Sequence, residues 1–304
     1  MSGLKYCMTR FAVCFGVTAA LLFAVYAEAN TLKYNPPMAE NDAQKSYFVT
    51  LLKRVCEQAK ALDIPCELSP VDVVMFQQRQ LKSLDKGLLD VMWTMTSVSR
   101  ENDYLPVRIP LTKGLIGYRI AVVHNHHASA FNADASVANI KKLQHVQGHD
   151  WPDTEILRFN GFEVSTTSWY SSLYKALDDH HYDVLLRGAL EVSTEFALYP
   201  TQQLSVDMNH AFYYPSAIYF FVSKSRPELA AMFSKGLIAL KTTGEFDQLL
   251  FEFPPHANAF KRLSLGNRKV HLLENPLLPE ETPLDNPELW FVNDLINQAR
   301  SDSK

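Results

Sequence analysis

A group of hydroxyl side chains stands next to an arginine at the end of an apolar run. Thr94, Thr96 and Ser97 close the segment 88–97, and Arg100 follows three residues later. A guanidinium group can bind a carboxylate through two parallel hydrogen bonds, and hydroxyl groups can donate to the same anion. We therefore expect this group to bind a carboxylate. The alternative is that Arg100 lies on the surface and pairs with a neighbouring acidic side chain.

A second arginine occupies a similar place in the middle of the chain. Arg187 directly follows an apolar stretch, 182–186, that we expect to be a strand, and Glu191 lies four residues further on. An arginine from each half of the protein would favour a ligand with more than one anionic group, or one without an amine. The same spacing also suits an ion pair on a helix surface, so both interpretations remain open.

A third candidate region precedes a predicted helix, 152–160. Asp150 or Asp153 could cap that helix, and the free amide groups at a helix N-terminus favour anions. Aromatic side chains near these regions could line a cleft, although each could also belong to the core. The residues that we expect near a ligand are Trp93, Thr94, Thr96, Ser97, Arg100, Tyr104, Asp150, Trp151, Arg187 and Glu191.

Histidines form the one group that suggests a metal. His124, His126 and His127 lie close together, and His180 and His181 form a separate pair. Two histidines on a loop can hold a metal ion, but no carboxylate lies within two residues of the first group. We therefore expect neither a dedicated metal site nor a cofactor.

The composition argues against several classes of function. The formal net charge of −4 lacks the basic excess that is typical of nucleic-acid binding. The motifs G-x-S-x-G and H-E-x-x-H and a glycine-rich phosphate loop are missing from the sequence, which holds only 11 glycines. We therefore do not expect an enzyme. The alternative is a lyase or dehydratase in which Glu191 or Glu195 serves as a general acid.

Strands and helices alternate along most of the chain, which is typical of mostly parallel sheets flanked by helices. The first unit should contain strands 31–35, 66–68 and 88–95 with helices 46–62 and 77–84. The second should contain strands 117–124, 162–166 and 182–186 with helices 152–160 and 169–177. Strand 217–222 follows, then a helix that Ser225 and Glu228 should cap together, a helix 246–253 and an extended, proline-rich arm from Pro254.

Three stretches resemble the family 3 periplasmic solute-binding proteins, which serve the uptake of polar amino acids. They are LDKGLLDVMWTMTSVSRENDYLPVRIPLTKGLIGYRIAV, DVLLRG and YFFVSKSRPELAAMFSKGLIALKTTGEFDQLLFEF, of which the last is the most specific. The resemblance covers about Thr31 to Phe253. In the family, an arginine in the position of Arg100 binds the α-carboxylate of the ligand. The family commonly has T-x-x-R, whereas Thr96 stands four residues before this arginine and Ser97 three before it.

The resemblance implies a fold and a division into lobes. The fold would be the α/β type II fold of periplasmic binding proteins, in which a two-stranded hinge joins two mostly parallel sheets flanked by helices. The first lobe would comprise residues 30–118 and 221–304, including the arm, and the second lobe residues 119–220. The ligand would lie between the lobes, because open α/β sheets bind ligands at the carboxyl ends of their strands.

The first thirty residues follow the order of a secretory signal peptide. Lys5 and Arg10 precede an apolar run, 11–26, and the residues AEA at 27–29 offer a cleavage site. We expect export to the periplasm with removal of residues 1–29. A retained membrane anchor is the alternative.

Together these features predict an exported monomer that closes on a small polar or anionic ligand, an amino acid or a related carboxylate. It would deliver this ligand to an inner-membrane permease of the ABC type. The alternative is a sensory subunit that a membrane partner reads when the lobes close. Cys56 and Cys66 would remain after export into an oxidising compartment, where they could form a disulfide or stay as two buried thiols.

Overall fold

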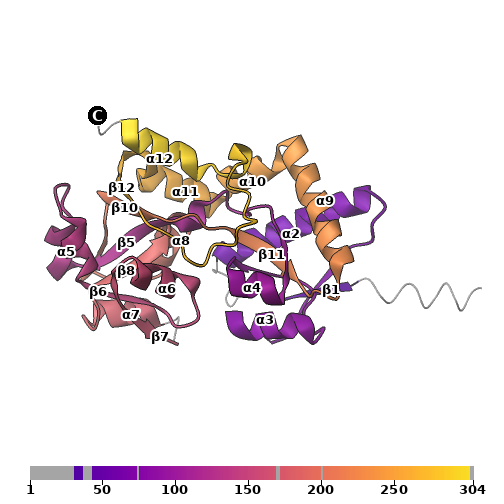
Figure 1. Cartoon of the computed structure of the whole chain (residues 1–304), viewed down its shortest axis with the longest axis horizontal. Helices are drawn as coiled ribbons and strands as arrows, with labels where there is room; N and C mark the ends of the chain where they lie inside the picture. Colours follow the sequence, from indigo (N-terminus) through magenta and orange to yellow (C-terminus); the bar gives the residue numbers. More distant parts are fainter. Residues whose placement is uncertain (1–30, 37–42, 74, 169–171, 200, 302–304) are drawn as a thin grey trace, which may run out of the picture.

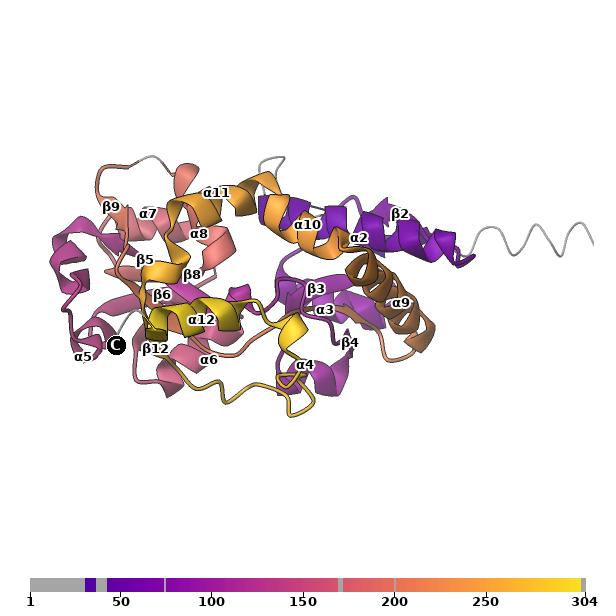
Figure 2. The same cartoon turned by 90° about the horizontal axis from the view of Figure 1, so that it is seen from above.

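The computed structural model describes residues 31–36, 43–73, 75–168, 172–199 and 201–301. The predicted signal peptide, residues 1–29, lies outside these ranges. Within the described part, none of the helices combines the length and the apolar character that a membrane span requires. Figures 1 and 2 show two lobes of strands and helices side by side.

The first lobe is built on parallel strands with helices between them. Its elements are β1 (Thr31–Tyr34), α2 (Ala43–Ala61), β2 (Glu67–Pro70), α3 (Gln77–Asp85) and β3 (Met92–Met95). Strands β1 and β2 pair in parallel, and Tyr34 forms a parallel bridge with Val91, just before β3. This is the alternation that the sequence predicts for residues 31–95.

One face of helix α2 belongs to the core of this lobe. Leu51, Leu52 and Val55 are fully buried, at the spacing of one helical face. Helix α9 (Pro227–Thr243) packs against this face. A Cβ at Gly236 of α9 would lie 2.7 Å from the backbone oxygen of Val55. The two helices therefore approach closely because a glycine stands at their contact.

A three-stranded sheet brings the chain back into the first lobe. Strand β11 (Ile218–Val222) lies between β3 and β4 (Leu105–Val107) and is antiparallel to both. All of its residues, IYFFV, are buried. This burial on both faces accounts for the continuous apolar run that marks the strand in the sequence.

The second lobe is a seven-stranded mixed sheet with helices around it (Figure 1). Its strands lie in the order β12-β10-β5-β8-β6-β7, and β9 also pairs with β5. The pairs β6–β7, β6–β8 and β10–β12 are parallel, whereas β5 is antiparallel to β8, β9 and β10. The strands are β5 (Tyr118–His124), β6 (Gln144–Gly148), β7 (Glu163–Thr167), β8 (Val184–Gly188), β9 (Leu204–Val206), β10 (His210–Tyr213) and β12 (Lys269–Leu272). The helices are α5 (Val137–Lys141), α6 (Pro152–Phe159), α7 (Leu173–Asp178) and α8 (Ala189–Ala197).

Two of the chain crossings between the lobes lie side by side. One leads from β4 to β5 through a short 3-10 helix (Leu115–Gly117), and the other leads from β10 to β11 through residues 214–217. A Cβ on Gly117 would lie only 2.0 Å from the backbone oxygen of Tyr214. The glycine therefore lets the two crossings lie backbone against backbone. The second crossing comes a few residues before residue 220, where the resemblance places the end of the second lobe.

The C-terminal arm differs from its predicted extended form. Pro254 and Pro255 form the first turn of helix α11 (Pro254–Arg262), where the N–H groups that proline lacks would have no helical partner. Further on, β12 adds a strand beside β10 at the edge of the second lobe's sheet. The assignment of the whole arm to the first lobe is therefore wrong for this strand. Helices α10 (Glu245–Glu252) and α12 (Val292–Ser301) lie over different lobes in Figure 2.

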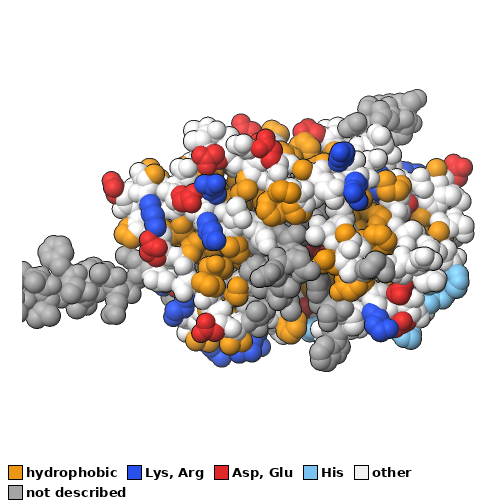
Figure 3. All heavy atoms as spheres, turned by 180° about the vertical axis from the view of Figure 1, so that it is seen from behind, with side chains coloured by type: hydrophobic (Ala, Val, Ile, Leu, Met, Phe, Trp, Pro, Cys, Tyr) orange, Lys and Arg blue, Asp and Glu red, His pale blue; other side chains and the backbone are white. Residues whose placement is uncertain are grey.

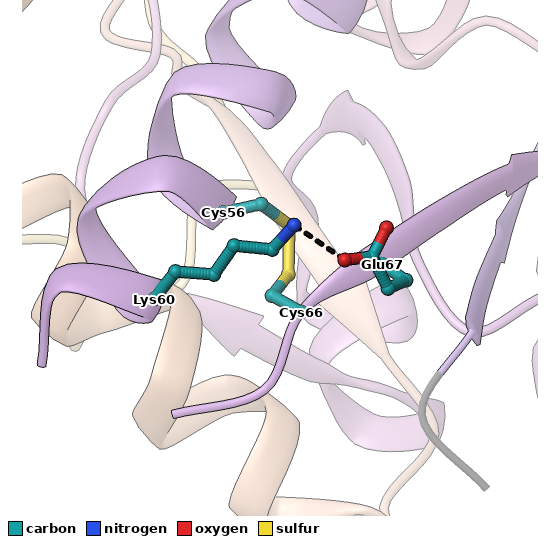
Figure 4. Close-up of a disulfide and its surroundings, with 4 residues drawn as sticks. All are labelled: Cys56, Lys60, Cys66 and Glu67. Carbon is teal, nitrogen blue, oxygen red and sulfur yellow. Dashed lines mark hydrogen bonds and ion pairs between the residues drawn. A yellow bond between two sulfur atoms is a disulfide. The ribbon is translucent and has the colours of Figure 1, made fainter. Parts of the chain in front are cut away.

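The predicted disulfide between Cys56 and Cys66 is confirmed. It joins α2 to the residue before β2, with the two Cα atoms 5.2 Å apart, and both side chains are buried. Lys60 and Glu67 form an ion pair beside it, between the same two elements (Figure 4). The bond therefore holds the C-terminal half of α2 against the start of β2.

Candidate ligand-binding cleft

Residues from both lobes line a cavity of about 530 Å³. Sites for small molecules commonly have volumes of about 300–1,000 Å³. The wall from the first lobe holds most of the apolar side chains, together with polar ones such as Arg79, and the wall from the second lobe carries most of the charge. The first lobe contributes, among others, Phe48, Met75, Phe76, Gln77, Trp93 and Thr94, and the second contributes Arg119, Asp150, Trp151, Asp153, Arg187, Glu191 and Glu195.

A tryptophan forms the centre of the apolar wall. Trp93 on β3 stacks on Phe48 of α2, with ring centroids 5.6 Å apart and an interplanar angle of 27°. Its other neighbour is Phe220, which lies opposite it on β11 and meets it edge-on at 6.5 Å. The indole is half-buried. It therefore presents a fixed, flat apolar surface to the cavity.

The charged wall contains a deeply buried arginine. Arg119 on β5 is only 1% exposed and forms an ion pair with Asp153 of α6. Its Nε donates to the hydroxyl of Tyr214 at 2.8 Å, and that hydroxyl donates to Asp153. Burial raises the pKa of Tyr214, although the charge of Arg119 opposes the shift, so the hydroxyl keeps its proton. These contacts supply the partners that a buried charge requires.

A second arginine, on β8, is held by two glutamates of α8. The Nε and Nη2 atoms of Arg187 donate to the two carboxylate oxygens of Glu195 at 2.7 and 2.6 Å. Glu191 lies 3.1 Å from the same guanidinium and also accepts the Gly188 amide at 2.9 Å. The ring of Trp151 lies 4.5 Å from the guanidinium carbon. The ion pair that the sequence allows between Arg187 and Glu191 is therefore present, but Glu195 is the bidentate partner.

These groups give the wall charges of both signs. Two guanidinium groups, of Arg119 and Arg187, face the carboxylates of Asp153, Glu191 and Glu195. With Asp150 of the same lobe and Arg79 of the first lobe, the lining of the whole cavity holds four carboxylates and three guanidinium groups, an excess of one carboxylate. A ligand that enters must exchange with partners already in place, because unpaired charges are costly in a buried site. The wall suits a molecule that carries both signs better than it suits a plain anion.

Both terminal nitrogens of Arg100 bind groups of the protein. Its Nη1 donates to Thr94 Oγ1 at 2.8 Å and to the Met95 oxygen at 2.6 Å. Its Nη2 donates to Gln77 Oε1 at 2.5 Å and to the backbone oxygen of Asp150, in the second lobe, at 3.3 Å. Burial lowers the pKa of Arg100 to about 10, so it stays charged at neutral pH. The contact with Asp150 makes this arginine a link between the lobes.

Four of the predicted residues do not line the cavity, namely Arg100 and three residues around it. Thr96 donates to Glu101, and Ser97 accepts the Arg100 amide at 3.3 Å, which caps helix α4 (Val98–Asp103). Tyr104 is buried at the end of the same helix. The predicted residues that line the cavity are Trp93, Thr94, Asp150, Trp151, Arg187 and Glu191.

The aspartates before α6 do not have the predicted capping role. Trp151 occupies the N-cap position, and no side chain caps that end of the helix. Asp153 lies in the first turn and pairs instead with Arg119, which lies 34 residues earlier in the chain. The demand of a buried guanidinium for a carboxylate outweighs a local capping bond, which contributes only about 1 kcal/mol.

The sequence interpretation missed Arg119. Its signal was available, since Arg119 interrupts the otherwise apolar strand GYRIAVV. A charged side chain on a buried strand needs a partner, and such residues often mark a site. The identity of the partner depends on how β5 and α6 pack, which no local pattern indicates.

The comparisons with known proteins establish the fold. No model of a protein family and no curated protein matches this sequence. A periplasmic binding protein of Salmonella typhimurium with high arginine specificity is 14% identical, with a TM-score of 0.57, over 74% of this chain and 99% of that one. A histidine kinase sensor domain with similarity to periplasmic binding proteins is 17% identical, with a TM-score of 0.58, over 75% and 96%. An amino acid ABC transporter substrate-binding protein from Streptococcus pneumoniae, bound to L-arginine, is 14% identical, with a TM-score of 0.53, over 76% and 94%.

These structures share with the present chain the two-lobed α/β fold of periplasmic binding proteins. The predicted fold class is therefore confirmed. Two of the three are described as binding proteins for amino acids or arginine, which is the type of protein that the sequence stretches resemble.

Proposed function

We propose that this protein is an extracytoplasmic solute-binding protein that closes its two lobes on an amino acid. The observation that carries the proposal is the cavity between the lobes, with an aromatic wall on one side and a wall of paired charges on the other. The two crossings at Gly117 and Tyr214 supply the hinge for closure. The contact of Arg100 with the Asp150 oxygen links the lobes beside this cavity.

The charged wall favours a zwitterion as the ligand. The ligand's carboxylate would bind Arg187, and its ammonium group would bind Glu191 or Glu195. Exchange of one ion pair for another keeps every charge paired, which avoids a cost of several kcal/mol for each unpaired buried charge. The excess of one carboxylate favours a further positive group on the ligand. This refines the small polar or anionic ligand that the sequence predicts.

The aromatic wall favours a long basic side chain. Trp93 and Phe48 form a flat surface opposite the charged wall. The methylene groups of a basic side chain could pack on the indole, and a cation over an aromatic face contributes about 0.5–2 kcal/mol. Two of the similar structures are described by their binding of arginine, which supports this class of ligand.

The cleft is proposed to bind without chemistry. Glu191 and Glu195, the general acids of the alternative interpretation, both lie against Arg187 as acceptors. An acceptor held by a guanidinium is poorly placed to donate a proton. The protein would be exported, lose residues 1–29, and deliver its ligand as a monomer to an inner-membrane permease. A sensory role would use the same cleft with a different membrane partner.

A thermal unfolding screen of amino acids and dicarboxylates tests the proposal. Ligand at a hundredfold over its dissociation constant stabilises the folded protein by about 2.7 kcal/mol. With an unfolding entropy of about 2.1 cal/mol/K per residue, this raises the Tm of a chain of this length by about 5 °C. We expect such shifts for basic amino acids and none for dicarboxylates.

Glu195→Gln is the diagnostic variant, because it removes the bidentate partner's charge while it keeps the shape. It should raise the dissociation constant of a basic amino acid at least tenfold, as measured by calorimetry. The matched control is Glu57→Gln, since the side chain of Glu57 is 60% exposed on α2 and does not line the cavity. Tm shifts with dicarboxylates alone would contradict the proposal of a zwitterionic ligand. Formation of a product from the ligand would favour the alternative of an enzyme. A screen without any hit would contradict the proposed function.

A further inference from the structure

A cluster of histidines lies at the outer end of the second lobe. Figure 3 shows histidine side chains (pale blue) gathered at that end of the molecule. His124 ends β5, His126 and His127 lie in the 3-10 turn that follows, and His180 follows α7. Pairing of β5 with β8 brings them beside Asp183, since the His124 amide donates to the Asp183 backbone oxygen at 3.0 Å. The carboxylate that the local sequence lacks therefore comes from another part of the chain.

Three ligand atoms of this cluster form a nearly equilateral triangle. Nε2 of His127 lies 3.3 Å from Nε2 of His180 and 3.1 Å from Oδ1 of Asp183, and the third edge is 3.6 Å. On a tetrahedral zinc ion with bonds of about 2.0–2.1 Å, two ligand atoms lie about 3.3 Å apart. We propose that His127, His180 and Asp183 bind a Zn²⁺ ion. This reverses the expectation, drawn from the sequence, of no dedicated metal site.

Hydrogen bonds between these three atoms cannot satisfy all three edges of the triangle at once. A neutral imidazole carries one N–H and one acceptor nitrogen. The Nε2 proton of His127 can point to Asp183 or to His180, but one proton cannot serve both. One edge of the triangle then joins two lone pairs or two protons at close range. A cation between the three atoms is bound by all of their lone pairs at once.

The surroundings orient each ligand for this role. Nδ1 of His180 lies 3.3 Å from Nδ1 of His126, so its N–H can donate there while Nε2 binds the ion. The ring of His124 stacks on that of His180 at 4.1 Å, with 7° between the planes. Oδ2 of Asp183 accepts the Gln144 amide at 2.9 Å, which turns Oδ1 toward the histidines. Metal-binding histidines and carboxylates are typically held by such outer partners.

The site is accessible and separate from the cleft. The side chains of His127 and His180 are 31% and 38% exposed, so an ion can enter from solvent. The described residues of this group provide three ligand atoms, which leaves the fourth position for water. Imidazole nitrogen with a carboxylate oxygen is a common ligand set for zinc. Arg119 of the cleft lies five residues before His124 on β5, about 17 Å away at the rise of an extended strand.

Zinc titration of the full chain tests the site. Protein without an added histidine tag is freed of metal by chelation and dialysis, and Zn²⁺ binding is measured by calorimetry and by the Tm. We expect one high-affinity ion per chain. His126→Ala should weaken it by roughly 10–100-fold, the usual effect of losing an outer partner. His127→Ala and Asp183→Asn should each weaken it further. His181→Ala, an exposed neighbour outside the group, is the matched control and should bind as the wild type does.

Cobalt binding provides a readout that distinguishes metal ligands from residues that only stabilise the fold. Co²⁺ in a tetrahedral site absorbs visible light much more strongly than octahedral Co²⁺. The absorption should appear with wild type, reach its maximum at one equivalent, and vanish in His127→Ala. The absence of saturable zinc binding to the wild type would overturn the proposal. If His127→Ala and Asp183→Asn bound zinc as tightly as the wild type does, the proposal would also be overturned. The same holds if His181→Ala lost as much zinc affinity as these two variants.

Discussion

Replacement of Arg119 by methionine tests whether the charged wall of the cleft is held together by ion pairs. Methionine has a similar length, but it leaves Asp153 buried without a guanidinium, with only 7% of its side chain exposed. Removal of one partner of a buried pair costs about 3–5 kcal/mol. Because Tyr214 keeps its hydrogen bond to Asp153, we expect a loss at the lower end, about 3 kcal/mol.

Urea unfolding measures this loss directly, and thermal unfolding provides a second reading. With an unfolding entropy of about 2.1 cal/mol/K per residue, the Tm should fall by about 5 °C. The double variant Arg119→Met with Asp153→Leu removes both charges. Apolar replacement of a complete buried pair is often neutral or stabilising, so the double variant should recover most of the loss.

The control is Arg54→Met, which removes an exposed ion pair with Glu57. Such pairs contribute about 0–1 kcal/mol, so this variant should match the wild type closely. The reasoning would be refuted by an Arg119→Met variant as stable as the wild type. A double variant less stable than both single variants would refute it equally.

Three further predictions concern the stability of the folded chain. Burial lowers the pKa of His256 to about 4, whereas the unfolded value is about 6.5. The unfolded chain takes up this proton first, so His256 alone should lower the stability by up to about 3 kcal/mol from pH 6.5 to 4. Burial also lowers the pKa of His145 and His271 to about 4, so His256→Gln should make the fall measured by urea unfolding smaller without abolishing it. Loss of the bond between Cys56 and Cys66 in a double serine variant should cost about 3 kcal/mol, and an unchanged Tm would contradict this. Gly117→Ala would place a Cβ 2.0 Å from a backbone oxygen of the other crossing, so it should lower the Tm by several degrees, whereas an exposed Ser→Ala change should not.

The alternation of strands and helices could be predicted because periodicity is a local property of the sequence. The buried face of α2 and the apolar run of β11 both appear where the pattern indicates them. Local rules fail where another group competes for the same side chain. Ser225 and Glu228 have the spacing of a capping box, but α9 begins at Pro227 without a side-chain cap. Glu228 pairs instead with Arg226, which also reaches Asp90 in the first lobe.

The candidate site could be predicted in part, because contacts between near neighbours in the sequence are also local. The hydroxyl group of Thr94 does meet Arg100, as their spacing suggests. Three further donors of Arg100 bind groups from α3, from β3 and from the second lobe. Sequence spacing shows which neighbours can meet, but the packing of distant elements decides which of them remain available to a ligand. The distance of Asp183 from His127 in the chain hid the zinc site in the same way.

Zinc and the cleft ligand should bind independently, although both sites use β5. A ligand changes an equilibrium between open and closed lobes only if its affinity differs between the two forms. The proposed zinc ligands, His127, His180 and Asp183, all belong to the second lobe, so closure leaves their distances unchanged. We therefore expect the dissociation constant of an amino acid to change less than about twofold when zinc is added, a coupling well below the 5–150-fold typical of allosteric proteins. Calorimetry with metal-free and zinc-loaded protein measures both constants. A tenfold difference would show that the outer end of the lobe moves during closure, and by reciprocity the ligand would then change the zinc affinity by the same factor.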